Sequence, residues 1–267
     1  AEILSGNNYR IWVKGSFGTF LIDVDEHMAY PQFKPVTTYE DSAVYCIDMG
    51  TRIYRGRMEI GRYQKSTLTA VNIVPLEEYL YSVVASEMPS TWNQEALKAQ
   101  AVCARSYALV KAGYQGESNA KKGYKLVDTT SSQVYKGYLA ETSKSAAAVR
   151  ATKGEMVCYD NQVVAAYFFS TSGGRTESSE AAWSVAKPYL VSVTDIYETN
   201  PEKKPWLVSM TKKELSSRLL ARGVSVGEVQ DVKVTSYTDT GRVYALLISG
   251  TNGRTTLQES AIRTALG

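Results

Sequence analysis

A proline at position 89 separates two strong helical patterns, and this break constrains the fold more than any other feature of the chain. The first pattern, residues 75–88, begins with Pro75, which is favoured in the first turn of a helix, and repeats apolar residues at helical spacing. Because a proline disfavours helical geometry in the residue before it, the helix is predicted to end at Met88. Glu87 therefore lies in its last turn.

Glu87 is a candidate general acid because of this position. The dipole of the helix disfavours an anion in the last turn, and burial would raise the pKa of the carboxyl further. The alternative is an exposed residue at a helix end with no chemical role.

The second helical pattern, residues 95–109, carries a stripe of mostly small residues that would allow a neighbouring helix to approach closely. The stripe consists of Leu97, Ala101, Ala104 and Ala108. Ser90 or Thr91 is predicted to cap the start of this helix, and Gly113 is predicted to end it. Two polar residues interrupt its otherwise apolar and small surface, Gln100 and Arg105.

Strands are predicted on both sides of the helical segment. Alternating patterns predict antiparallel strands in the N-terminal part, at Tyr9–Val13, Thr19–Asp23, Ala43–Ile47 and Thr67–Val74. Residues 75–152 are predicted to be helical, with a third helix at Ser143–Ala151, and the remainder is again rich in strands. Runs of one type of element favour an α+β fold. We expect a strand-rich region over 1–74 and a catalytic region over 75–267, or one compact unit that joins them.

The C-terminal part contains several local signals of secondary structure. Asp160-Asn161 predicts a hairpin turn between residues 156–159 and a strand that runs from 162 to 169. Thr211 and Glu214 form a capping box that predicts a helix as far as Arg222. Strands are also predicted at 232–234 and 243–248, around the turn at 239–241.

Composition limits the classes of function. A net charge of +3 without a long basic run argues against nucleic acid binding. The only histidine is His27 and the three cysteines are far apart, so we expect no zinc site, no cofactor and no Ser-His-Asp triad. The chain has no apolar run of the length needed to span a membrane and opens without methionine. We therefore expect a protein outside the cytoplasm, in the cell wall or anchored through a removed segment.

Several motifs resemble those of the stage II sporulation protein D and amidase-enhancer family of bacterial cell-wall proteins. The resemblance covers about residues 70–267. The most specific motif is Ser86-Glu87-Met88-Pro89, followed by a helix that reads Glu-Ala-Leu-Lys-Ala-Gln-Ala and then Ala104-Arg105-Ser106-Tyr107. The weaker matches are Asp128-Thr129-Thr130, Gln133-Val134-Tyr135, Phe169–Thr176, Pro188–Val193 and the tail from Gly250.

The resemblance implies a peptidoglycan lytic transglycosylase. Enzymes of this family cleave the MurNAc–GlcNAc bond of glycan strands stripped of stem peptides and leave 1,6-anhydro ends. The glutamate of the Ser-Glu-Met-Pro motif is their catalytic residue, which corresponds to Glu87 here. Sporulation members work with a peptidoglycan amidase. A non-catalytic wall protein that binds glycan or enhances an amidase is the alternative.

A single carboxylate is consistent with this reaction. Ordinary glycosidases need two carboxylates about 5–9.5 Å apart, whereas Glu78 would lie about 13.5 Å from Glu87 along the helix axis. In a lytic transglycosylase the 6-hydroxyl of the sugar is the nucleophile, so one glutamate can act as acid and then as base. Asp128 or Glu177 could still fold into range.

The remaining candidate residues are expected to bind substrate. Arg105 could orient a sugar substituent, pair with Glu87 or be a solvated charge, and we also include Gln100. Gln133 and Tyr135 could line a groove, because amides and phenols suit sugar hydroxyls. The loop Ser170–Thr176 could bound the same groove, and its donors could hold an N-acetyl group or merely form a tight turn. Its candidate residues are Ser170, Ser172, Gly173 and Gly174.

Some sporulation members of the family resemble metal-binding proteins, because they carry His and Cys residues in and around the block that corresponds to Asp128-Thr129-Thr130. Here Ser131 and Ser132 stand where those members place ligands. The resemblance therefore implies no metal for this chain.

Overall fold

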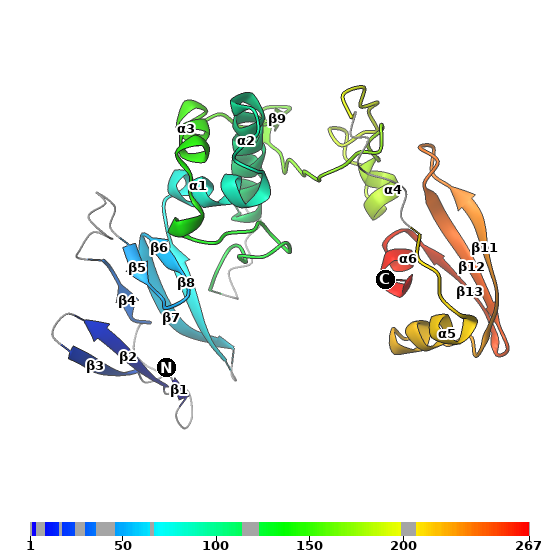
Figure 1. Ribbon diagram of the computed structural model, residues 1–267, viewed down its shortest axis with the longest axis horizontal. Helices are drawn as coiled ribbons and strands as arrows, with labels where there is room; N and C mark the ends of the chain where they lie inside the picture. The colour runs from blue at the N-terminus through cyan, green and yellow to red at the C-terminus, as the bar shows by residue number, and fades with distance from the viewer. Residues whose placement is uncertain are drawn as a thin grey trace. The chain divides into compact units, whose positions relative to one another are not determined.

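The computed structural model describes residues 2–3, 9–15, 18–24, 30–35, 46–64, 67–113, 123–198 and 207–266. Helices and small antiparallel sheets follow one another in runs, which confirms the predicted α+β class. The chain forms two compact units, Ala1–Phe168 and Phe169–Gly267. The predicted strand-rich region 1–74 thus shares its unit with the helices that follow it. Figure 1 shows the elements of each unit.

The N-terminal part of the first unit consists of short antiparallel strands. These are β1 (Glu2–Ile3), β2 (Tyr9–Gly15), β3 (Gly18–Val24), β4 (Gln32–Phe33), β5 (Cys46–Asp48), β6 (Ile53–Arg55), β7 (Arg57–Gln64) and β8 (Thr67–Ile73). They form the sheets β1-β2-β3, β4-β7-β8 and β5-β6. The predicted strands are confirmed at β2, β3 and β8, whereas residues 43–45 lie outside the described part. The strand β7 was missed, although Met58 and Ile60 alternate into the core.

In the described part of the first unit, three α-helices pack against one another: α1 (Leu76–Glu87), α2 (Gln94–Lys111) and α3 (Ser143–Ala151). The predicted small-residue stripe of α2 is buried against α1 and α3 in a common core, because alanine leaves room for close approach. Between α2 and α3 the described chain has only a short 3-10 turn, η2 (Tyr138–Ala140), so the prediction that 75–152 is helical was too broad. Among the described helices, none is long and apolar enough to cross a membrane.

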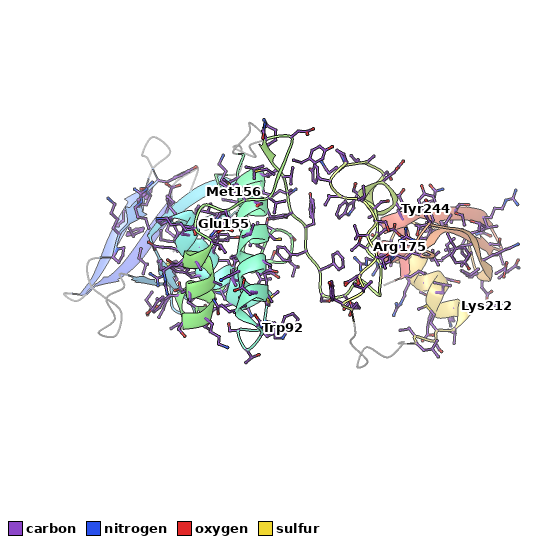
Figure 2. The ribbon with its side chains drawn as sticks, turned by 90° about the horizontal axis from the view of Figure 1, so that it is seen from above. Trp92, Glu155, Met156, Arg175, Lys212 and Tyr244 are labelled. Atoms are coloured by element: carbon purple, nitrogen blue, oxygen red, sulfur yellow. The ribbon has the colours of Figure 1, made fainter. Side chains whose placement is uncertain are left out.

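The turn between α1 and α2 differs from the prediction. The cap of α2 is Asn93, whose side chain accepts from the backbone N–H of Glu95 at 2.9 Å, rather than Ser90 or Thr91. The cap lies later in the chain than predicted because residues 89–92 form a tight turn before the helix begins. In this turn the backbone N–H of Trp92 donates to the carbonyl of Pro89. Figure 2 shows Trp92 at this turn. Gly113 follows the helix with a φ of +87°, as predicted for a helix stop.

The hairpin after α3 is shorter than predicted. It joins β9 (Cys158–Tyr159) to β10 (Gln162–Val163), and Asp160 and Asn161 both have positive φ, as a two-residue hairpin turn requires. The predicted strand 162–169 was wrong beyond Val163. The partner strand β9 has only two residues, so the ladder ends there.

The second unit packs helices against the antiparallel sheet β11-β12-β13. Its elements are α4 (Ser179–Trp183), α5 (Lys212–Ala221), β11 (Val229–Tyr237), β12 (Val243–Gly250), β13 (Gly253–Gln258) and α6 (Glu259–Leu266). The predicted capping box of Thr211 and Glu214 is confirmed at the start of α5. The predicted strands around 239–241 are confirmed as β11 and β12.

Candidate functional site

Glu87 is the last residue of α1 and so lies in its last turn, as the sequence predicts. Met88 is extended, with a φ of −136° and a ψ of 134°, because Pro89 follows it. The preceding turn is anchored by Val83 and Val84, which are fully buried. A rigid, packed helix therefore holds a half-buried carboxylate at the point where the chain turns away.

The block 133–136 is fixed against α1 by hydrogen bonds to three side chains of that helix. The backbone N–H of Val134 donates to Glu87 Oε1 at 2.7 Å, and the backbone N–H of Lys136 donates to Ser82 Oγ at 3.2 Å. Tyr79 Oη donates to Gln133 Oε1 at 3.1 Å. The structure thus brings Glu87 together with the Gln133–Tyr135 block. Sequence reasoning missed Tyr79 and Ser82, since their partners lie more than fifty residues away.

The Glu87 carboxylate accepts the Val134 N–H at one of its two oxygens, Oε1. Within the described residues, Oε2 has no hydrogen-bond partner and no lysine or arginine forms an ion pair with the group. A carboxyl group that is oriented in this way can donate or accept a proton at its second oxygen. That geometry suits a general acid or base.

Arg105 does not pair with Glu87. Its Nε and Nη2 donate to the two carboxylate oxygens of Glu77, both at 2.8 Å, and its guanidinium also donates to the carbonyls of Val149 and Glu155. Glu155 is labelled in Figure 2. The second helix packs against the first and brings Arg105 to the first turn of α1 rather than to the last.

The residue Arg105 is also only 1 % exposed, which excludes a solvated helix charge. A bidentate pair with Glu77 and two carbonyl acceptors occupies most of its donors. Direct contact between Arg105 and a substrate is therefore not expected.

Three other candidate residues are buried as well. Gln133 is fully buried, and its Nε2 donates to the carbonyl of Ala104 at 3.1 Å. Tyr135 is 6 % exposed and donates to Asn72 Oδ1 at 2.8 Å. Gln100 is 7 % exposed, and its Nε2 has no partner among the described residues. We expect Gln133 to position the block beside Glu87 rather than to contact a glycan.

The Ser170–Thr176 loop belongs to the second unit, so its predicted proximity to Glu87 stays a prediction. Gly173 and Gly174 have φ values of +67° and +91°, which only glycine adopts easily. Ser172 Oγ donates to Asp195 at 2.8 Å and accepts from the N–H of Gly174 at 3.1 Å. One of the two glycine donors is therefore used inside a tight turn, while Ser170 and Gly173 are exposed.

A charged network supports this loop from the β11–β12 hairpin. Arg242 Nη2 donates to the carbonyls of Ser172 and Arg175, at 2.6 and 2.7 Å. Thr240 and Thr238 donate to Glu177. Partial burial opposes ionisation of this carboxyl, but the two hydroxyls hold the pKa of Glu177 below its ordinary value.

In the described part of the chain, no group of three or more His, Cys, Asp or Glu side chains is arranged to hold a metal ion. Ser132 Oγ instead accepts from the backbone N–H of Val127 at 3.3 Å, and a backbone hydrogen bond from Tyr135 to the carbonyl of Asp128 closes the loop 128–135. Residue His27 lies outside the described residues.

Comparison with known proteins gives consistent similarities. Residues 64–159 match the stage II sporulation protein family. The chain is 37% identical over 210 residues to stage II sporulation protein D of Bacillus subtilis, which covers 74% of this chain and 59% of that protein. It is 39% identical over 179 residues to the same protein of Bacillus amyloliquefaciens, covering 63% of this chain and 48% of that protein. The identity to the amidase enhancer of Bacillus subtilis is 37% over 141 residues, or 53% of this chain and 18% of that protein. The chain spans about half the length of the first two relatives.

Proposed function

We propose that this protein acts on the bacterial cell wall as a peptidoglycan lytic transglycosylase, because residues 64–159 match the stage II sporulation protein family. Its substrate would be glycan strands that carry no stem peptides, and its site of action would be outside the cytoplasm. The observation that supports the proposal is the Glu87 carboxyl, which is held by Val134 at one oxygen and open at the other.

In this proposal Glu87 serves both halves of the reaction. Its protonated Oε2 donates to the glycosidic oxygen as the bond from C1 of MurNAc to that oxygen breaks. The resulting carboxylate then accepts the proton of the 6-hydroxyl of the same MurNAc, whose oxygen bonds to C1. The products are a 1,6-anhydroMurNAc end and a free GlcNAc hydroxyl, and Glu87 is again protonated. No water and no second carboxylate are consumed.

The decisive variant is Glu87→Gln, which keeps the acceptor for the Val134 N–H but cannot transfer the proton. We expect the rate of release of 1,6-anhydro products from peptide-stripped peptidoglycan, followed by mass spectrometry, to fall about 10²–10⁴-fold. The matched control is Glu95→Gln, because the Glu95 side chain is 76% exposed and lies in the first turn of α2. Wild-type rates in Glu87→Gln would contradict the proposal.

A second candidate function is the enhancement of a peptidoglycan amidase without catalysis by this chain. The similarity to a protein named amidase enhancer favours it. Adding wild type or Glu87→Gln to a purified peptidoglycan amidase distinguishes the two. Equal stimulation by both proteins, with no 1,6-anhydro products, would support enhancement and contradict the enzyme.

A further inference from the structure

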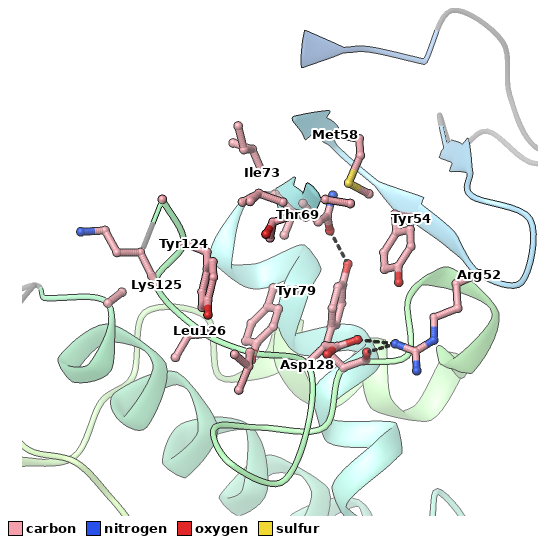
Figure 3. Close-up of a pocket in the computed structure, with 18 of the residues that line it drawn as sticks. Arg52, Tyr54, Met58, Thr69, Ile73, Tyr79, Tyr124, Lys125, Leu126 and Asp128 are labelled. Carbon is pink, nitrogen blue, oxygen red and sulfur yellow. Dashed lines mark hydrogen bonds and ion pairs between the residues drawn. The ribbon is translucent and has the colours of Figure 1, made fainter. Parts of the chain in front are cut away.

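A cavity of about 950 Å³ lies within the first unit, and the function proposed for Glu87 does not account for it. The strand β8, the end of α2 and the segment 123–128 contribute to its walls, as Figure 3 shows in close-up. Glu87 does not line the cavity. Its volume lies at the upper end of the range found for small-molecule sites.

Four tyrosine rings form one wall of the cavity: Tyr54, Tyr79, Tyr124 and Tyr135. The ring of Tyr135 lies between two others, with its centroid 4.9 Å from that of Tyr79 and 5.8 Å from that of Tyr54. Figure 3 labels Tyr54, Tyr79 and Tyr124 among the residues that line the cavity. The wall is therefore a row of aromatic rings rather than a single contact.

The two inner rings are held in place before any ligand arrives. Tyr79 is tied to Gln133 and Tyr135 to Asn72, whose own amide donates to the carbonyls of Arg55 and Arg57 at 2.8 and 3.0 Å. Burial raises the pKa of both phenols above the ordinary value, so these two rings stay neutral at physiological pH. Rings that are already ordered lose little freedom on binding.

The polar groups of the cavity suit a ligand rich in hydroxyl groups. Arg52 and Asp128 form an ion pair with each other at one end, so their charges offset. Thr67 and Thr69 add hydroxyl groups from β8. A pyranose ring matches both the aromatic wall and the polar groups, because it places its C–H face against aromatic rings and its hydroxyl groups against polar side chains at the edge.

We propose that this cavity is an accessory binding site for N-acetylated amino sugars of the glycan strand, separate from Glu87. The proposal rests on the cell-wall function inferred above. The loop 128–135 links the two places, since Asp128 and Tyr135 line the cavity while Val134 holds Glu87. A strand bound in the cavity would thus contact the same loop that orients the carboxyl group.

The test measures binding of a β-1,4-linked trimer of N-acetylglucosamine by calorimetry, in the Glu87→Gln background so that no turnover interferes. Ala70→Trp fills the cavity from an exposed position on β8 without removing any contact. Tyr124→Ala removes one ring of the wall. The control is Tyr237→Ala, which removes a 62% exposed tyrosine from the second unit.

We expect Ala70→Trp to abolish the binding event of the cavity and Tyr124→Ala to raise the Kd of that event about two- to tenfold, while Tyr237→Ala leaves it unchanged. Failure of the parent protein to bind the trimer, or equal Kd values in all variants, overturns the proposal. The cleavage assay is independent of this result. Loss of trimer binding in Ala70→Trp together with no 1,6-anhydro products would sustain the accessory site and contradict the enzyme.

Discussion

The two units fix their polar loops by different physical means. In the first unit the block 133–136 is held by buried side chains of α1, and the buried Arg105 is paired with Glu77 inside the helical core. In the second unit the Ser170–Thr176 loop is held by partly exposed charges, because Arg242 and its partner Glu177 have side chains that are 42% and 17% exposed. Buried hydrogen bonds resist salt and pH, whereas exposed charged networks do not. The first arrangement suits a carboxyl group that must stay in one place.

The largest effect on stability is expected at the buried pair in the first unit. Arg105→Met leaves Glu77 without its bidentate partner and should lower the free energy of unfolding by about 3–5 kcal/mol. Denaturant unfolding followed by fluorescence measures the change. The matched control, Lys98→Met, breaks the exposed pair with Glu95 and should cost less than about 0.5 kcal/mol. Similar losses in both variants would show that burial does not distinguish the two pairs.

A smaller effect is expected at Gln133 in the same unit. Gln133→Leu keeps the volume of the side chain but leaves the Tyr79 hydroxyl and the Ala104 carbonyl without their partner, at a cost of about 1–3 kcal/mol. The proposed cleavage should fall as well, because the block that holds Glu87 loosens. The two readouts, unfolding and product release, should therefore change together. A stable variant with full activity would contradict a positioning role.

In the second unit, Arg242→Met removes two charge-assisted hydrogen bonds to the Ser170–Thr176 loop. Because the side chain is partly exposed, the expected loss is only about 1–2 kcal/mol and should shrink in high salt. Hydrogen exchange of the loop amides, compared at low and high salt, measures it. If salt does not change this loss, the Arg242 network resists salt as the buried hydrogen bonds of the first unit do, and the contrast between the two units fails.

The smallest effect concerns pH. The pKa of Glu177 lies below its ordinary value of 4.5 in the folded state, so its stabilising contribution is present above pH 4.5 and is lost as the pH falls through the folded pKa. In Glu177→Gln, the stability of the second unit should decline less steeply below pH 4.5. Hydrogen exchange of the loop amides, measured across an acid titration, follows this decline. An unchanged acid profile would assign the decline to other carboxyls.

Local features were predictable because their hydrogen bonds join residues close together in the chain. The end of α1 at Pro89, the bounds of α3, the capping box of Thr211 and the turn at Asp160-Asn161 all follow from such contacts. Sequence pattern also predicted the small-residue stripe of α2. The cap of α2 was local but still mispredicted, since the turn after Pro89 shifted it from Ser90 or Thr91 to Asn93.

By itself, the sequence determined that this chain places one glutamate at a helix end before a proline, next to a small-residue helix. Only the tertiary structure decided which groups surround that glutamate. Arg105 meets Glu77, 28 residues away, and Val134 meets Glu87, 47 residues away. Hydrophobic periodicity shows which face of a helix is buried but carries no information about the register in which two helices pack. That register sends the arginine into the core and leaves the second carboxylate oxygen of Glu87 open.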